Sequence, residues 1–86
     1  MYYVYILKSL LVERYYIGHT KELVKRVEDH NRGKTRSTKA YLPWKVVYTE
    51  EYQTKSEAFR REKEIKGYKS GYKFHELKNL ERWQSG

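Results

Sequence analysis

The chain has 86 residues and carries 19 Lys and Arg against 11 Asp and Glu, which gives a formal net charge of +8. This length suits one domain with a modest core, and 38% hydrophobic with 35% charged residues is typical of a globular chain rather than a disordered or membrane-embedded one. No apolar run approaches the roughly 20 residues that span a bilayer. The absence of cysteine excludes disulfides and thiolate metal sites. The N-terminal residues lack the pattern of a secretion signal, so we expect a cytoplasmic protein.

The first half of the chain predicts a β-hairpin followed by a helix. Residues 2–8 and 14–19 are rich in Tyr, Val, Ile and Leu, which is typical of two paired strands. Thr20 is suited to be the N-cap of a helix of about eleven residues that ends near Gly33. The apolar side of this helix would be formed by Leu23, Val24 and Val27.

The second half predicts a third strand and two more helices. The strand covers residues 45–52, and a capping-box pattern from Thr54 to Glu57 opens a helix through Lys66. We expect a shorter helix around residues 72–83. The inward side of the capped helix would be formed by Ala58, Phe59 and Ile65. The result is an α+β fold in which helices pack on a three-stranded sheet.

Positive charge is concentrated in one segment without acidic residues, and a basic surface favours polyanions such as nucleic acid. The neighbouring hydroxyl and glycine residues suit phosphate oxygens, although solvated loop charges would explain the same pattern. Tyr41 and Trp44 close the segment as core residues or base-stacking platforms, and core is the favoured role for Trp44. The positive residues of the segment are Arg32, Lys34, Arg36, Lys39 and Lys45.

In the first helix, Glu22, Arg26 and His30 are spaced four residues apart and therefore share one face. Arg26 could hold a phosphate, with His30 hydrogen-bonding beside it. Alternatively, Arg26 pairs with Glu22 on the surface and His30 complements the helix dipole.

Glu62 shares an apolar helical stripe with Ala58 and Ile65, so its carboxylate should face the sheet. A buried carboxylate requires compensation. A divalent cation such as Mg²⁺ is one solution, and an ion pair with Lys66 or Arg26 is the other.

Tyr5 and Tyr16 should lie close together across the hairpin. A phenol orients or deprotonates water only where positive charge lowers its pKa from about 10. Packing is the default role for each, since the chain holds ten tyrosines.

Four ordered blocks, YVYILKS, YYIGHT, KRVEDHN and SEAFRREKEIK, resemble the GIY-YIG nuclease superfamily, and more narrowly its small single-domain bacterial excinuclease-like branch. The resemblance covers residues 2–80. It implies a three-stranded antiparallel sheet flanked by about three helices, with one domain over residues 1–80 and a C-terminal tail over residues 81–86. Tyr3 replaces the nominal glycine of the first motif half.

The resemblance also assigns roles by position. It places an arginine for the scissile phosphate at Arg26 and a single metal-binding glutamate at Glu62. A glycine that allows close approach of the phosphate falls at Gly18. The family's asparagine after the glutamate helix has no clear equivalent, and Asn79 is the only asparagine in that region. The expected catalytic residues are Tyr5, Tyr16, Arg26, His30 and Glu62.

The function implied is hydrolysis of DNA phosphodiester bonds with one Mg²⁺ or Mn²⁺ on Glu62, leaving 5′-phosphate and 3′-hydroxyl ends. Tyr5 would act as general base or orient the water, helped by Tyr16 and His30. We expect structure-directed cleavage related to repair or recombination, with RNA as an alternative substrate. A noncatalytic nucleic-acid-binding or partner-recruiting module is the second hypothesis. The expected nucleic-acid-binding residues are Gly18, Arg32, Lys34, Arg36, Lys39 and Lys66.

Overall fold

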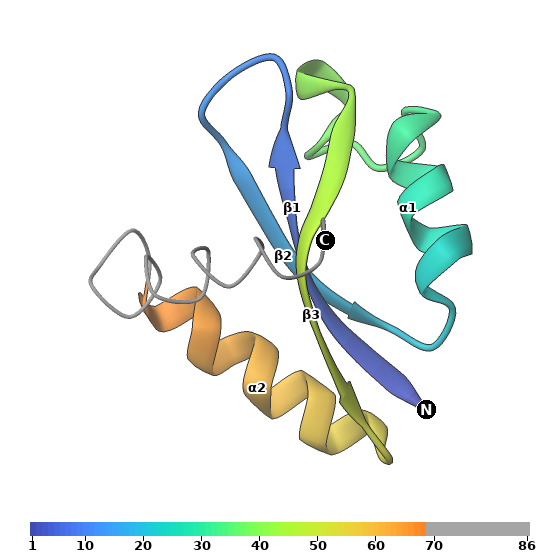
Figure 1. The fold of residues 1–86 in the computed structure, drawn as a ribbon, viewed down its shortest axis with the longest axis vertical. Helices are drawn as coiled ribbons and strands as arrows, with labels where there is room; N and C mark the ends of the chain where they lie inside the picture. Colours follow the sequence, from blue (N-terminus) through green and yellow to red (C-terminus); the bar gives the residue numbers. More distant parts are fainter. Residues whose placement is uncertain (69–86) are drawn as a thin grey trace, which may run out of the picture.

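The computed structural model describes residues 1–68, which form three strands and two helices (Figure 1). The expected α+β class and the antiparallel sheet are confirmed. The third predicted helix, Asn79 and the expected tail lie outside the described residues. Neither helix of residues 1–68 has the length and apolar character needed to cross a bilayer. The elements in chain order are β1 Tyr2–Ser9, β2 Tyr15–Thr20, α1 Leu23–Asn31, a 3₁₀ turn Lys39–Tyr41, β3 Trp44–Tyr52 and α2 Lys55–Tyr68.

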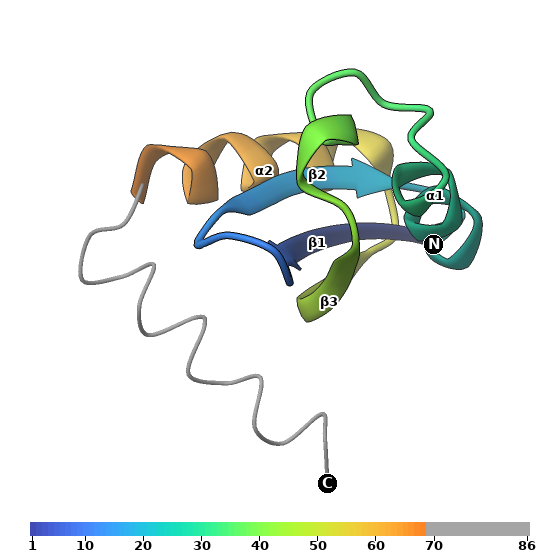
Figure 2. The same cartoon turned by 90° about the horizontal axis from the view of Figure 1, so that it is seen from above.

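The sheet has the order β2-β1-β3, so β1 is its central strand (Figure 2). Both neighbours run antiparallel to β1. In this register Tyr5 of β1 lies opposite Gly18 of β2 and Thr49 of β3. A register shift between Ile6 and Leu7 marks a bulge in the pairing with β3. Because β2 is an edge strand, a ligand beside it can contact side chains from both faces of the sheet.

The two helices pack on opposite faces of the sheet, on either side of the strands in Figure 1. Side chains alternate along a strand, so β1 contributes to two separate cores. Val4 and Ile6 pack with Ala58 of α2. Tyr5 and Leu7 lie in the other cluster, against which α1 packs.

Three local predictions about the helices, for Thr20, Val24 and Phe59, were wrong. Thr20 remains in β2 and pairs with Tyr3, and α1 begins only at Leu23 with Glu22 as its N-cap. Val24 is 74% exposed because the side chains that α1 turns toward the sheet are those of Leu23 and Val27.

Phe59 is 48% exposed, because α2 contacts the sheet through Ala58, Glu62 and Ile65. The capping box itself is confirmed. The Glu57 N–H donates to Thr54 Oγ1, and the Thr54 N–H donates to Glu57 Oε1, each over 3.3 Å.

The basic loop after α1 is fastened to both neighbouring elements. The Asn31 side chain accepts a hydrogen bond from the Trp44 N–H at 2.7 Å and donates to the Trp44 carbonyl at 3.0 Å. The Trp44 indole N–H donates to the Thr38 carbonyl at 2.9 Å. Trp44 is buried, as expected of a core residue. These bonds hold Thr38 against the C-terminal end of α1.

Candidate active site

A chain of hydrogen bonds runs through the interior from β1 to the basic loop. The Tyr5 hydroxyl lies 3.1 Å from His30 Nε2, and His30 Nδ1 lies 2.9 Å from the Thr38 hydroxyl. Tyr5, His30 and Thr38 are all buried. The family resemblance predicted that Tyr5 and His30 would share a site. Thr38, one of the hydroxyl residues of the basic segment, was not expected to join them.

The direction of these bonds follows from the donors present. The Thr38 hydroxyl donates to the Thr35 carbonyl at 3.3 Å, so it accepts from His30 Nδ1–H. His30 Nε2 is then a free acceptor, and the Tyr5 hydroxyl donates to it. Burial and the charge of Arg26 lower the pKa of His30, which favours this neutral tautomer.

Arg26 approaches the same hydroxyl from α1. Burial raises the pKa of Tyr5 to about 12, while a hydrogen bond from Arg26 acts in the opposite direction. The charges of Tyr16 and Glu62 raise the Tyr5 pKa further. In the protein alone, burial therefore outweighs the guanidinium, and Arg26 by itself does not lower the Tyr5 pKa below its ordinary value. Tyr5 carries its proton at neutral pH.

Tyr16 encloses the other side of this group. Its ring centroid lies 6.3 Å from that of Tyr5 and 4.7 Å from that of His30. Hydrogen bonding to Tyr5 raises the pKa of Arg26, and Tyr16 contributes in the same direction. Arg26 therefore faces the tyrosines, and among residues 1–68 no ion pair joins it to Glu22. His30 lies in the last turn of α1, and its side chain is fully buried.

Gly18 leaves room for the Tyr5 side chain. A Cβ at this position would lie 2.7 Å from the Tyr5 hydroxyl oxygen and 2.9 Å from its ring carbon Cζ. Real Cβ atoms essentially never come this close. The requirement for glycine is thus already explained by Tyr5, before any phosphate is considered.

Glu62 lies on the α2 side of the sheet and is 7% exposed, as the apolar stripe predicted. Its Oε1 lies 2.5 Å from His19 Nδ1, and its Oε2 lies 2.5 Å from Lys66 Nζ. The predicted ion pair with Lys66 is therefore present. His19 was missed as a site residue, and its place beside Gly18 in an edge strand was the signal that could have found it.

Glu62 suits a hard divalent cation. Mg²⁺ and Mn²⁺ accept a single carboxylate when water and substrate phosphate complete their coordination. Within residues 1–68, no group of three or more His, Cys, Asp or Glu could form a closed metal cage. The donor set fits an open site on Glu62 that needs substrate oxygens to complete it.

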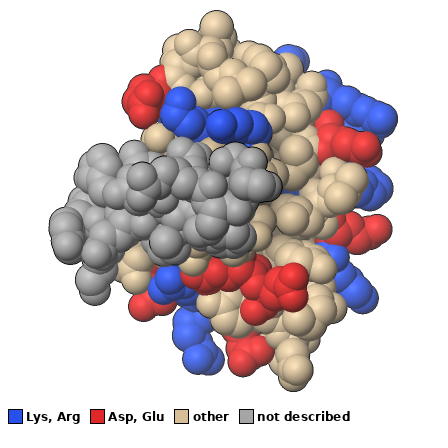
Figure 3. All heavy atoms as spheres, viewed as in Figure 1, with Lys and Arg blue, Asp and Glu red and all other residues tan. Residues whose placement is uncertain are grey.

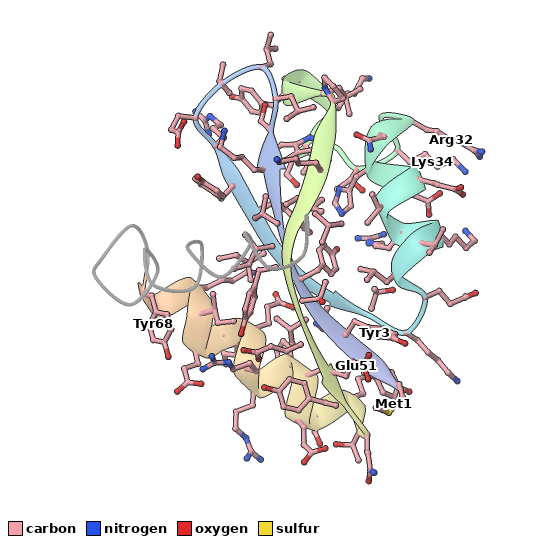
Figure 4. All side chains as sticks on the ribbon, viewed as in Figure 1. Met1, Tyr3, Arg32, Lys34, Glu51 and Tyr68 are labelled. Atoms are coloured by element: carbon pink, nitrogen blue, oxygen red, sulfur yellow. The ribbon has the colours of Figure 1, made fainter. Side chains whose placement is uncertain are left out.

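The expected nucleic-acid-binding residues of the loop are all exposed. Figure 4 shows Arg32 and Lys34 pointing outward at the C-terminal end of α1. Lys34 lies 3.7 Å from Asp29, which also pairs with Lys25 at 3.4 Å. Positive and negative groups alternate on this side of the molecule (Figure 3).

Arg36 and Lys39 flank Thr38 in the sequence, so the loop reaches the buried chain of hydrogen bonds. Tyr41 is half-buried, and the Arg14 guanidinium lies 4.4 Å from its ring centroid. One face of the Tyr41 ring is therefore already covered.

The model of the GIY-YIG catalytic domain family matches residues 1–73. The chain belongs to the GIY-YIG family. UPF0213 proteins of several Staphylococcus aureus strains, COL among them, are 52% identical over 54 residues, which is 62% of this chain and 66% of theirs. The solution structure of a UPF0213 protein from Bacillus halodurans is 34% identical, covers 93% of this chain and 85% of its own, and superposes with a TM-score of 0.55. These relatives confirm a small bacterial GIY-YIG family.

Proposed function

We propose that this GIY-YIG protein is a metal-dependent endonuclease that hydrolyses phosphodiester bonds in DNA. The observation that carries the proposal is the Tyr5 hydroxyl, which lies between the guanidinium of Arg26 and Nε2 of His30. An oxygen with a cation on one side and a proton acceptor on the other is suited to receive a proton from water next to a phosphate. A hydrogen bond to His30 alone would satisfy a buried core tyrosine, so the added cation of Arg26 is the feature that favours the chemical role.

The raised pKa of Tyr5 and the lowered pKa of His30 define the starting state of the proposed proton relay. Tyr5 is protonated at neutral pH and its proton points at neutral His30. As water attacks phosphorus, the Tyr5 oxygen takes the water proton while the phenolic proton passes to His30 Nε2. The water oxygen forms the new bond to phosphorus as the bond to the leaving oxygen breaks. The leaving oxygen would then take a proton from solvent, and His30 would release its extra proton to solvent, which restores the starting state. Tyr5 thus acts as a general base without becoming a free phenolate.

Charge on the phosphate is balanced from both sides of β2. Arg26 would donate hydrogen bonds to the non-bridging oxygens as negative charge develops on them. Glu62 would hold the divalent cation, which when bound supplies Lewis-acid stabilisation of the phosphate and the leaving oxygen. Tyr16 would position Tyr5 and Arg26 through the contacts described above.

The exposed cations of the loop, Arg32, Lys34, Arg36 and Lys39, would hold the DNA backbone beside this centre. They contact phosphates without reading bases, so selection would depend on the shape of the substrate. Such selection suits a role in DNA repair or recombination.

Cleavage of labelled linear, nicked, flapped and branched DNA with Mg²⁺ or Mn²⁺ tests the proposal. We expect products from the parent protein and a loss of about 10²–10³ in rate for Arg26→Ala, as when one donor to a developing oxyanion is removed. Glu62→Ala should be inactive while DNA binding is retained. Lys55→Ala, which removes an exposed cation at the first residue of α2, serves as the control. Binding without product on every substrate would instead support a noncatalytic nucleic-acid-binding module.

A further inference from the structure

Both oxygens of the Glu62 carboxylate already have partners. Oε1 contacts the imidazole of His19 and Oε2 contacts the ammonium of Lys66, each over 2.5 Å. A cation that binds this buried carboxylate must therefore replace at least one of them. The two partners differ in how easily they can leave.

Lys66 is the partner that can leave. Its side chain is 52% exposed, so its ammonium can return to water on a flexible stem with little loss of hydration. The His19 side chain is only 20% exposed, stands on β2, and lies with its ring 5.6 Å from that of Phe59. His19 therefore stays beside Glu62 when Lys66 moves away.

A retained His19 is itself a ligand for divalent cations. The neutral imidazole can present the lone pair of Nδ1 while Nε2 carries the proton. Two ligands at right angles, each about 2.1 Å from a metal, are roughly 3 Å apart. The His19 and Glu62 atoms need only a small separation from their present distance to reach that arrangement.

We propose that His19 and Glu62 together form the divalent-cation site and that Lys66 occupies the site when no cation is bound. The inference rests on the proposed function, in which Glu62 holds the metal. An imidazole ligand favours Mn²⁺ over Mg²⁺, because Mg²⁺ prefers oxygen ligands. The displaced Lys66 ammonium becomes available to a DNA phosphate, so metal binding and DNA binding strengthen each other.

Titration with Mn²⁺ in the absence of DNA, followed by electron paramagnetic resonance, tests the site without measuring cleavage. Pulsed spectra of the bound ion should show hyperfine coupling to one imidazole nitrogen. His19→Ala should lose this coupling and weaken Mn²⁺ binding about tenfold or more. His19→Asn retains a hydrogen-bond donor for Glu62 but no imidazole. It should weaken Mn²⁺ binding as much as His19→Ala does, whereas restored affinity would mean that His19 only supports Glu62.

Lys66→Met should tighten Mn²⁺ binding by about twofold or more, because the ammonium no longer competes for Glu62 Oε2 and at least the energy of a weak ion pair is recovered. Lys63→Met is the matched control. It removes the same charge from the neighbouring turn, where the Lys63 ammonium lies 5.4 Å from the Phe59 ring centroid. Lys63→Met should change the affinity clearly less than Lys66→Met does.

Three results would overturn the inference: no imidazole coupling in the parent protein, no Mn²⁺ bound at millimolar concentration, or equal effects of the two lysine variants. Mn²⁺ binding that Glu62→Gln leaves unchanged would remove the metal role of Glu62 as well. If the parent protein shows hyperfine coupling of Mn²⁺ to the His19 nitrogen but cleaves no DNA, the proposed function alone would be contradicted.

Discussion

The Tyr5 hydroxyl and His30 Nε2 are 25 residues apart in the chain and 3.1 Å apart in the folded protein. Both side chains are buried, so each satisfies a polar atom that would otherwise be costly to remove from water. This bond joins the central strand to α1. It also determines where the phenolic proton points, which makes it a structural bond and the first step of the proposed relay.

Tyr5→Phe separates these two roles. The ring is kept, so the free energy of unfolding should fall by only about 1–3 kcal/mol, the cost of leaving His30 Nε2 without its donor. Cleavage should fall by about 10²–10⁴, the usual contribution of a general base. Urea unfolding and initial cleavage rates on one substrate measure both. A variant that is equally stable and still cleaves at the parental rate would remove Tyr5 from the mechanism.

Most of the fold was predictable because it follows from local patterns. The alternating strands, the capping box and the stripe from Ala58 through Glu62 to Ile65 each depend on residues close in sequence. Helix starts and exposed apolar residues were harder. The residues around Val24 and Phe59 in the sequence do not show that each helix turns a neighbouring side chain toward the sheet and leaves these two exposed.

The contact between Tyr5 and His30 was predictable, but the other bonds of the candidate site were not. The family resemblance placed these two residues together, yet the pKa of Tyr5 depends on how deeply strand β1 is buried, which only packing determines. His19 escaped notice because its partner Glu62 is 43 residues away. Such a pair exists only once α2 lies across the edge strand.

Gly18→Ala should damage the site through sterics alone. The new Cβ would lie 2.7 Å from the Tyr5 hydroxyl, so the ring must move from its place beside Arg26 and His30. We expect a loss of about 1–3 kcal/mol in the free energy of unfolding, as for other overpacked interiors, together with loss of cleavage. Thermal or urea unfolding gives the first quantity.

Gly67→Ala is the matched control for this substitution. Among the described residues 1–68, and apart from its chain neighbours and the backbone of its own helix, no atom lies within 4 Å of a Cβ at Gly67, and the residue is helical. Alanine should therefore stabilise the protein slightly, by about 0.5–1 kcal/mol. Equal effects of the two substitutions would show that Gly18 is not constrained by Tyr5.

The depressed pKa of His30 predicts how stability depends on pH. Burial, followed by the charge of Arg26, lowers the pKa of His30 below its ordinary value of 6.5. The unfolded chain thus binds a proton more readily than the folded one. The stability that neutral, buried His30 contributes to the folded protein is fully present above pH 6.5. It is lost as the pH falls from 6.5 through the lower pKa of His30 in the folded state.

Urea unfolding of the parent and of His30→Gln across this range tests the linkage. Glutamine offers an acceptor for Tyr5 and does not titrate. The difference in unfolding free energy between the two proteins should shrink as the pH falls. A difference that stays constant with pH would show that His30 has the same pKa in both states.

Arg61 and Glu50 form a half-buried cluster that should support the fold without touching the proposed chemistry. Arg61 Nε and Nη2 donate to the two Glu50 oxygens over 2.9 and 3.0 Å, and the hydroxyls of Tyr48 and Tyr52 donate to the same carboxylate. Burial raises the pKa of Glu50, but these hydrogen bonds outweigh it, with Arg61 contributing most, and hold the pKa below its ordinary value.

Arg61→Met should therefore cost about 1–3 kcal/mol of unfolding free energy, because it leaves a half-buried carboxylate without its cation and two of its hydrogen bonds. The loss should be largest above pH 4.5, the ordinary Glu value, and should diminish as acid protonates the carboxylate. The double variant Arg61→Met with Glu50→Gln should recover much of the stability, since no unpaired charge remains. Unfolding curves of the parent, both single variants and the double variant give the coupling energy. A coupling near zero would mean that solvent, rather than Arg61, stabilises the Glu50 carboxylate.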